Sequence, residues 1–411
     1  MKQRLMRYGL YALAGMVVLS SVRVFTGARD LTSVGTASAA LLLAVPIALA
    51  GLGGLFSERA GVVNIGLEGM MIMGTWAAGF YGYQYGPWAA IIAATAFGVI
   101  ASLLHAIATI TFGVDHVVSG VAINIIAAGM VRYLSVILYS GVEGAGPTQS
   151  PSIGLVGVNG LPVLSGGTIL GWQSPDLLGS LAAQQWFLVS DIAAVFRGLT
   201  GGVSYLTMLA LLLFPLSYWL LWKTSFGLRL RSAGEAPIAA ESLGVGVYAM
   251  KYAGVLISGA LAGLGGGYLA VVAANNYQEG QTGGRGFIGL AAMLFGNWRP
   301  GGLVAGSALF GFADSLQLRA SGAIHSALLV VAIALLAYAI LRLRRAERLG
   351  AAIAAVSAIA VFVFWWQVDE LPGQFVTMTP YVTTLLVLSL AKQRLRMPAA
   401  DGLPYRKGGA H

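Results

Sequence analysis

The sequence contains no cysteine, and only 9% of its 411 residues are charged. The absence of cysteine excludes disulfides, thiolate metal sites and cysteine nucleophiles together. The charged fraction is too small to cover the surface of a water-soluble domain, which carries roughly 25% charged residues. Hydrophobic residues make up 57% of the chain instead. The composition therefore predicts an all-α protein that crosses a membrane many times.

Several motifs of enzymes are also missing. The chain has no GxxxxGK[S/T] phosphate-binding loop, so we do not expect it to bind and hydrolyse ATP itself. It has no GxSxG motif and no histidine pair at the spacing of a zinc site, so we predict no catalytic residues and no metal site. The net charge of +9 lies in short clusters beside apolar segments, which indicates membrane orientation and not nucleic acid binding.

Apolar stretches that can cross the hydrocarbon core as helices, which takes about 20 residues, occur throughout the chain. Two further stretches, 286–298 and 301–317, are short, and at 1.5 Å per residue the first reaches about 20 Å of the roughly 30 Å core. We predict broken or re-entrant helices there. The predicted spans, about ten, are residues 8–25, 35–56, 61–82, 87–111, 117–139, 201–222, 250–273, 322–341, 350–366 and 378–391.

Lysine and arginine residues gather in four places, and all four fall on one side of the membrane if the spans are counted in this way. The positive-inside rule identifies that side as the cytoplasm, so both termini are expected there. The basic start ahead of an apolar run resembles a signal peptide, but no convincing cleavage site follows, and we expect the first span to be retained. The basic residues are Lys2, Arg4 and Arg7; Lys223, Arg229, Arg231 and Lys251; Arg342, Arg344, Arg345 and Arg348; and Lys392, Arg394, Arg396, Arg406 and Lys407.

We predict a single transmembrane domain, residues 1–411, with two interruptions. Residues 143–200 are rich in Gly, Pro and Ser and poor in basic residues, so they are expected outside the cytoplasm as an insertion. Within them, residues 184–196 are compatible with an amphipathic helix along the membrane interface, but a loop that carries one surface helix is the preferred interpretation. In the second interruption, 223–250, a proline and a glycine bound a predicted short helix, 237–244, exposed to the cytoplasm.

Polar side chains within the apolar segments are candidates for a translocation pathway. Asn64 and Glu68 are four residues apart, which predicts a shared helix face. A carboxylate inside a membrane costs about 2.5–3.5 kcal/mol on insertion scales, so Glu68 is expected to face either a polar pathway or hydrogen-bonding groups of another helix. Asn124 in the fifth span and Asn276 in a polar outer segment complete the predicted pathway. An outer loop without such a role is the alternative for Asn276.

An internal similarity relates residues 65–76 to residues 288–298, with one gap. The predicted topology runs the first outward and the second inward. This is the pattern of an inverted repeat, whose interface commonly holds a transported ligand near the middle of the membrane. Chance similarity among Gly, Leu and Met is the alternative explanation.

Four motifs occur in order along the chain and together resemble permease subunits of bacterial ATP-binding cassette (ABC) importers. The family is the one that includes ribose-type and branched-chain amino acid permeases, and the likeness is greatest to nucleoside (simple-sugar-type) permeases. It extends from about residue 35 to the RMPAADGLPY tail (396–405). The motifs are ERAGVVNIGLEGMM (58–71), VDHVVSGVAIN (114–124), GLRLRSAGEAPIAAESLG (227–244) and GRGFIGLAAMLFGNWRP (284–300).

The resemblance implies that the central loop docks in a groove of a cytoplasmic ATP-binding subunit. That partner would hold ATP and Mg, and this chain would carry no cofactor. The resemblance also implies a second permease subunit, commonly a different chain, and an extracytoplasmic substrate-binding lipoprotein. Ala236 and Pro237 depart from the residues usual in the family at these positions. The docking residues implied are Arg231, Gly234, Glu235, Ala239, Ala240 and Gly244.

The leading hypothesis is a multi-pass permease of the bacterial plasma (inner) membrane, in contact with its lipids, that imports nucleosides or a related sugar-containing solute. The sequence does not distinguish purine from pyrimidine nucleosides or from a free sugar. The alternative is an ion-coupled secondary transporter or channel, in which Glu68 or Asp314 carries a proton or cation. A membrane enzyme has little support, because the catalytic motifs are missing.

Overall fold

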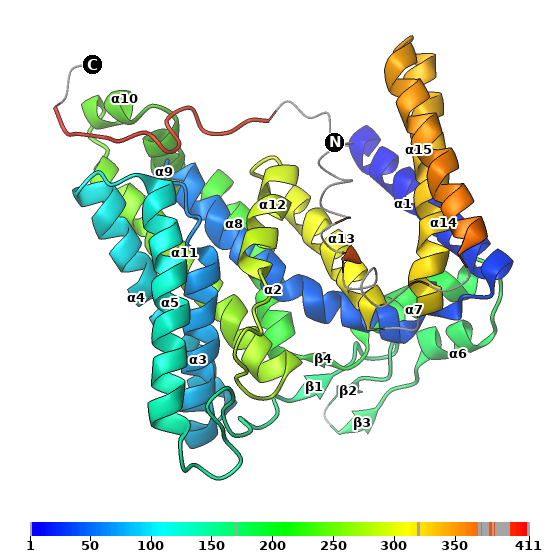
Figure 1. Ribbon diagram of the computed structural model, residues 1–411, viewed down its shortest axis with the longest axis horizontal. Helices are drawn as coiled ribbons and strands as arrows, with labels where there is room; N and C mark the ends of the chain where they lie inside the picture. Colours follow the sequence, from blue (N-terminus) through cyan, green and yellow to red (C-terminus); the bar gives the residue numbers. More distant parts are fainter. Residues whose placement is uncertain are drawn as a thin grey trace. The chain divides into compact units, whose positions relative to one another are not determined.

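The computed structural model describes residues 2–169, 171–318, 321–368, 371, 378–379, 382 and 395–408. Most of them are helical, and eight helices in these ranges are long and apolar enough to cross a membrane (Figure 1). The predicted all-α membrane fold is therefore confirmed. The predicted span 378–391 and the basic residues Lys392 and Arg394 lie largely or wholly outside the described residues.

The chain divides into two compact units. Unit 1 comprises residues 1–41, 159–203 and 312–383, and unit 2 comprises residues 42–158, 204–311 and 384–411. Two helices have residues in both units, because a unit boundary falls inside each of them: α2 (Val34–Arg59) and α13 (Pro300–Gln317). The candidate functional residues of the central loop and of the polar segments all belong to unit 2.

Unit 2 is built on a bundle of apolar helices. Its helices are α3 (Leu67–Tyr85), α4 (Pro87–Ala106), α5 (His116–Tyr139), α8 (Tyr205–Lys223), α9 (Ser225–Glu235), α10 (Pro237–Ser242), α11 (Val247–Tyr268) and α12 (Arg285–Phe295). The long helices α4 and α11 each continue into a wider π-helical turn, η2 (Ile107–Thr111) and η3 (Leu269–Ala273). Each predicted span from 8–25 to 350–366 overlaps an observed helix, although some ends differ.

Glycine brings three helices of unit 2 into backbone contact. A Cβ atom added to Gly98 of α4 would lie 2.2 Å from the carbonyl oxygen of Gly259 in α11, and one added to Gly74 of α3 would lie 2.4 Å from that of Gly263. No side chain fits at such distances. Such close contacts are what small residues permit between helices of membrane proteins.

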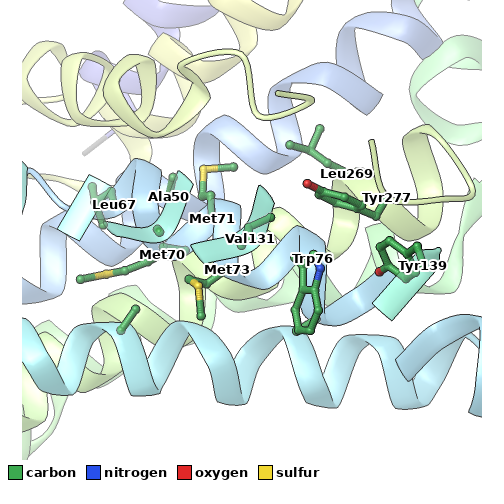
Figure 2. Packing of buried hydrophobic residues seen from close by; sticks show 14 residues of the cluster. Ala50, Leu67, Met70, Met71, Met73, Trp76, Val131, Tyr139, Leu269 and Tyr277 are labelled. Atoms are coloured by element: carbon green, nitrogen blue, oxygen red, sulfur yellow. The ribbon is translucent and has the colours of Figure 1, made fainter. Parts of the chain in front are cut away.

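A cluster of sulfur-containing and aromatic side chains fills the space between α3, α5 and η3 (Figure 2). Trp76 stacks on Phe80 with ring centroids 5.3 Å apart, and Tyr139 lies 6.1 Å from Tyr277. Trp76, Tyr139 and Tyr277 are all at most 3% exposed. The cluster fixes α3 against α5, because large rigid side chains buried together stabilise one arrangement of their helices.

One predicted helix start is wrong. Helix α3 begins at Leu67 and not at residue 61, because Gly61 adopts the left-handed conformation (φ 80°) and the backbone after it is not helical up to residue 66. The side chain of Asn64 stabilises this irregular path by accepting a hydrogen bond from the backbone NH of Gly66 at 3.1 Å. Asn64 therefore precedes the helix that carries Glu68, and the two do not share a helix face.

Unit 1 contains α1 (Lys2–Thr26), η1 (Arg29–Thr32), α6 (Leu177–Ala183), α7 (Val189–Thr200), α14 (Ser321–Arg344) and α15 (Arg348–Gln367). Four short strands accompany them: β1 (Val158–Asn159), β2 (Thr168–Ile169), β3 (Trp172–Gln173) and β4 (Val203–Ser204), of which β2 and β3 pair antiparallel. Helices α14 and α15 follow each other across a turn at residues 345–347, where Arg342 forms an ion pair with Glu347.

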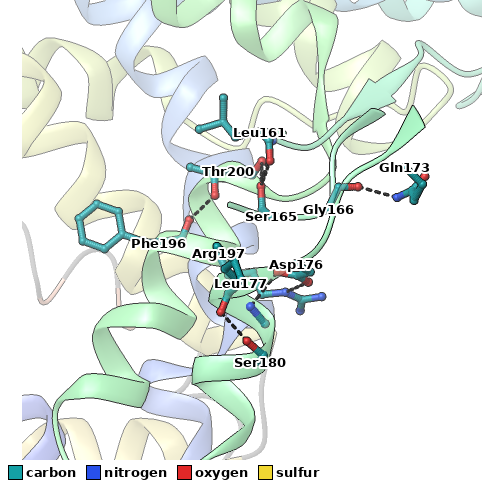
Figure 3. A network of polar contacts seen from close by, with 11 residues as sticks. Leu161, Ser165, Gly166, Gln173, Asp176, Leu177, Ser180, Phe196, Arg197 and Thr200 are labelled. Atoms are coloured by element: carbon teal, nitrogen blue, oxygen red, sulfur yellow. Dashed lines mark hydrogen bonds and ion pairs between the residues drawn. The ribbon is translucent and has the colours of Figure 1, made fainter. Parts of the chain in front are cut away.

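The predicted helix 184–196 is observed as α7, which begins five residues later. Its Asp191 is 2% exposed, pairs with Arg23 of α1 at 3.0 Å and accepts a hydrogen bond from Thr32. Neighbouring polar contacts, including the pair of Asp176 with Arg197 at 2.6 Å, hold the preceding loop to α7 (Figure 3). The buried face of α7, which carries Asp191, is thus anchored within unit 1. Its position along the membrane interface stays a prediction.

Candidate coupling surface and polar segment

The central charged loop folds into two short helices that turn sharply away from α8. Thr224 caps α9 by accepting a hydrogen bond from the NH of Gly227 at 3.1 Å, and a Cβ on Gly227 would lie 2.2 Å from the carbonyl oxygen of Leu220. Arg231 closes the corner, because its Nε donates to the carbonyl oxygen of Leu221 at 2.9 Å and its guanidinium lies 5.6 Å from the ring centroid of Trp222. The helix α9 was not expected from the sequence.

The short helix predicted at residues 237–244 is confirmed as α10. Pro237 occupies its first turn, and Gly244 follows its end in the left-handed conformation (φ 81°). Proline is favoured in the first turn of a helix and glycine just after its end, as the prediction assumed. Of the six residues of α10, all of them described, Ala240 alone is buried.

The six residues expected to dock on an ATPase divide into two groups. Glu235, Ala239 and Gly244 are exposed and available to a partner. Gly234 and Ala240 are buried, and Arg231 is held at the corner with α8. A Cβ on Gly234 would lie 2.4 Å from the carbonyl oxygen of Arg59, so this glycine is required for contact between α9 and the end of α2.

Two apolar side chains beside α10 were missed as candidates. Leu243 is 84% exposed and Ile238 is 53% exposed. The signal was present in the sequence, because leucine and isoleucine within a short polar loop have no membrane core to enter. Together with Glu235 and Ala239 they form an exposed candidate docking surface, which we call the coupling surface.

The C-terminal residues 395–408 lie against this region (Figure 1). Asp401 is 7% exposed, and its carboxyl group lies near that of the buried Glu58 at the end of α2. Burial and the neighbouring Glu58 carboxyl group raise the pKa of Asp401, with a smaller opposing effect of Lys251. The Lys251 ammonium group in turn donates to the carbonyl oxygen of Gly61 at 2.9 Å.

Glu68, a predicted pathway residue, caps the start of α12. One carboxylate oxygen accepts a hydrogen bond from the NH of Gly284 at 3.0 Å and the other from the NH of Gly286 at 2.7 Å. The side chain is 7% exposed. A carboxylate at a helix N-terminus is stabilised by the free NH groups and by the helix dipole. The geometry thus matches the hydrogen-bonding alternative for Glu68.

Asn64 and Asn124 hold the irregular segment 62–66 between α2 and α3. Asn64 is fully buried, and its amide donates to the hydroxyl of Ser258 in α11 at 2.9 Å. Asn124 of α5 accepts from the NH of Gly69 at 2.7 Å and donates to the carbonyl oxygen of Ile65 at 3.1 Å. The structure therefore brings three predicted residues, Asn64, Glu68 and Asn124, around the start of α3.

The fourth predicted residue, Asn276, lies elsewhere, in the loop after η3. Its side-chain oxygen accepts a hydrogen bond from the amide of Gln278 at 3.2 Å, and it is partly exposed. The neighbouring Tyr277 is buried in the aromatic cluster, and its backbone carbonyl oxygen accepts from the NH of Ser150 at 3.0 Å. Asn276 thus belongs to a loop whose position is fixed at the next residue, Tyr277.

Both histidines of this region contact the backbone of Val63. His105 contacts the Val63 carbonyl oxygen through Nε2 at 3.0 Å and the Ser119 hydroxyl through Nδ1 at 2.9 Å. His116 accepts from the Val63 NH at 3.1 Å. Both ring nitrogens of His105 and the Nδ1 of His116 are thus engaged with protein groups, which is typical of packing histidines. Across the part of the chain that the structure describes, no group of three metal-ligating side chains gathers.

Comparison with known proteins decides the family. The model of the branched-chain amino acid transport system / permease component family matches residues 36–340. The chain belongs to this permease family. The predicted resemblance is therefore confirmed. The protein is a multi-pass membrane protein and a transport component. Members of this family act with ATP-binding and substrate-binding partners in general.

Individual relatives extend along nearly the whole permease. It is 35% identical to the guanosine ABC transporter permease protein NupQ of Bacillus subtilis, over 90% of this chain and 96% of the relative. It is 32% identical to the nucleoside ABC transporter permease protein NupC of Lactococcus lactis, over 89% and 95%. A putative glucose ABC transporter permease protein of Haloferax volcanii is 32% identical over 69% and 77%. No solved structure matches the chain.

Proposed function

We propose that this permease imports nucleosides, or a related sugar-containing solute, across the bacterial plasma membrane, with ATP hydrolysed on a separate cytoplasmic subunit. The observation that carries the proposal is the identity to the guanosine and nucleoside permeases over about nine-tenths of the chain. The exposed α10 with Leu243 and Ile238 supports a docking contact with another protein, because apolar side chains outside a membrane favour burial in a partner.

The proposal has further parts. Both termini and the loop 223–250 are placed in the cytoplasm, and the insertion 143–200 on the opposite side. A second, different permease chain completes the pathway, and an extracytoplasmic lipoprotein delivers the solute. The predicted inverted repeat of 65–76 and 288–298 belongs to the same proposal, and the start of α3 and the start of α12 meet through Glu68.

For the four pathway residues we propose two kinds of role. Asn64, Glu68 and Asn124 position the irregular segment 62–66 and the start of α12 beside the pathway, since their polar atoms are engaged with protein groups. Asn276 is partly exposed and is proposed to face the outer mouth. Solute selectivity then depends on other groups of the assembled pair of permeases.

Uptake by cells that express the complete transporter tests the function. Radiolabelled guanosine is expected to accumulate, and unlabelled nucleosides are expected to compete, whereas leucine is not. Competition by glucose but not by nucleosides would instead favour the sugar, which the similarity to the putative glucose permease makes the second candidate. Guanosine uptake that persists without the ATP-binding subunit, and collapses when the proton gradient is dissipated, would overturn the ATP-driven mechanism.

A further inference from the structure

The C-terminal strap, defined as residues 395–408, is tied to the inner end of unit 2 by its backbone. The NH of Arg396 donates to the side-chain oxygen of Asn297, in the α12–α13 connection, at 2.7 Å. The NH of Ala400 donates to the carbonyl oxygen of Gly234, at the end of α9, at 3.0 Å. A chain terminus is ordered only where such contacts hold it. The strap therefore links two segments that are far apart in the sequence.

The far end of the strap contacts α10 directly. The hydroxyl of Tyr405 donates to a carboxylate oxygen of Glu241 at 2.6 Å. The Tyr405 ring lies beside Tyr248 of α11, with centroids 5.3 Å apart, and packs against the small buried cluster of Ala233, Ala240 and Val247. The strap thus covers the inner face of α10, which leaves Leu243 and Ile238 on the exposed side.

Helix α10 needs such support. It has six residues and one buried side chain, and a helix of this length is unstable by itself because nucleation costs more than its few hydrogen bonds return. Its position must therefore be set by tertiary contacts. Tyr405 provides such a contact from a segment outside the central loop.

We propose that the C-terminal strap positions the coupling helix, so that a displacement of α10 by the ATP-binding subunit is transmitted through the strap to the end of α2 and the segment 60–66. The inference rests on the proposed function, because it needs an ATP-binding partner at α10. The path is contiguous, because Glu241 contacts Tyr405 and Gly234 contacts Ala400. A Cβ added to Gly61 would lie 3.3 Å from the carbonyl oxygen of Ala400, so the strap also lies against the segment after α2. Segment 60–66 then leads into α3.

We expect strap binding to depend on pH, because the carboxyl groups of Asp401 and Glu58 are both buried in the bound strap. The groups that face its carboxyl are Glu58 and Arg59 at the end of α2 and Lys251 of α11. Two buried carboxyl groups that lie near each other do not both ionise readily, so the loss of the second proton is disfavoured. Because the pKa of Asp401 is raised from 3.8 to about 9 when the strap is bound, binding is strongest in acid and weakens as pH rises toward 9.

The main test is Tyr405→Phe in the complete transporter reconstituted in lipid vesicles. Loss of the hydrogen bond to Glu241 is expected to raise the ATP hydrolysed per guanosine imported about fivefold, the factor that corresponds to one such bond, while ATPase affinity stays unchanged. Tyr133→Phe, at an exposed tyrosine of α5, is the matched control and should leave the ratio unchanged. An unchanged ratio in Tyr405→Phe overturns the inference.

A purely structural role of Tyr405 predicts a different outcome, in which the amount of folded protein and both rates fall together and the ratio is kept. That outcome also overturns the inference. Failure of the proposed function is separable, because the unmodified complex would then not import guanosine at all. Glu241→Gln keeps an acceptor for the Tyr405 hydroxyl and is expected to show a smaller rise than Tyr405→Phe.

The second test follows strap binding directly. The sequence has no cysteine, so Leu403→Cys introduces a single labelling site on an exposed position of the strap. A spin label there is expected to become more mobile between pH 6 and pH 9, and Asp401→Asn is expected to remove this dependence because an amide does not titrate. The same pH profile in both proteins, or no change in either, contradicts the charge-dependent contact.

Discussion

The coupling surface and the polar segment around the start of α3 differ in how their side chains are satisfied. At the coupling surface, Leu243 and Ile238 are exposed apolar groups without protein around them. In the polar segment, Asn64 and Glu68 are buried and bonded to protein groups. Exposed apolar side chains favour burial against a partner, whereas buried polar side chains that are hydrogen-bonded stabilise the fold. We therefore expect mutations to separate the two regions, with stability lost in one and partner binding lost in the other.

The largest effect is expected for Glu68→Ala. It leaves the NH groups of the partly buried Gly284 and the buried Gly286 without their acceptor and should destabilise the permease by about 3 kcal/mol, the upper range for groups left unsatisfied. Thermal unfolding in detergent measures this change, with Glu143→Ala at an exposed position as the control. A melting temperature equal to that of the control would mean that Glu68 does not support α12. It would instead favour a direct role of Glu68 in the polar pathway.

A smaller loss of stability is expected for Gly234→Ala. The added methyl group would lie 2.4 Å from the carbonyl oxygen of Arg59, so α9 must move away from α2, at a cost of about 1–3 kcal/mol. Gly301→Ala is the matched control, since a Cβ there has open space within 4 Å. Because Gly234 also lies beneath the coupling surface, its variant should lose partner binding as well. Stability equal to that of Gly301→Ala would contradict the close contact.

The reverse pattern is expected for Leu243→Asp. Stability of the permease alone should change by no more than about 0.5 kcal/mol, because the side chain is 84% exposed. Affinity for the ATP-binding subunit should fall about tenfold, since a charge replaces an apolar contact buried on docking. Binding measurements with the purified subunits check this. Leu349→Asp, at a residue 77% exposed in α15, is the control. Unchanged binding would move the docking site elsewhere.

The smallest effect is expected for Asn276→Ala. The side chain makes one local hydrogen bond and is partly exposed, so stability should stay within about 0.5 kcal/mol of the unmodified protein. If Asn276 faces the outer mouth, uptake should show a raised KM for guanosine with normal protein levels. An unchanged KM would leave no role in transport for this residue.

The helices could be predicted from the sequence, whereas their interruptions could be predicted only in part. Long apolar runs and the residues Pro237 and Gly244 act locally, and the helices they predicted are present. The break at residues 61–66 was missed because its apolar composition resembles a span, and the conformation of Gly61 and the hydrogen bonds of Asn64 arise from distant elements. Apolar periodicity carries no information about such contacts.

Prediction of the site had the same limit. The motif around residues 227–244 identified the central loop, but its exposed and buried residues could be separated only after α9 was placed against Arg59 and Trp222. The contribution of residues 395–408 could not be foreseen, because a hydrogen bond between Tyr405 and Glu241 joins residues 164 positions apart.

The glycine contacts among α3, α4 and α11 have a consequence for alternating access. Helices whose backbones touch have no layer of side chains that can change rotamer between them, so they shift as one rigid body. Gly98 and Gly263 lie at the centre of this body. We therefore expect any change of backbone conformation at its ends, where the backbone is irregular: the segment 60–66 on one side and the loop after η3 on the other. The first of these segments follows α2. Lys251, His105 and His116 contact its backbone through hydrogen bonds.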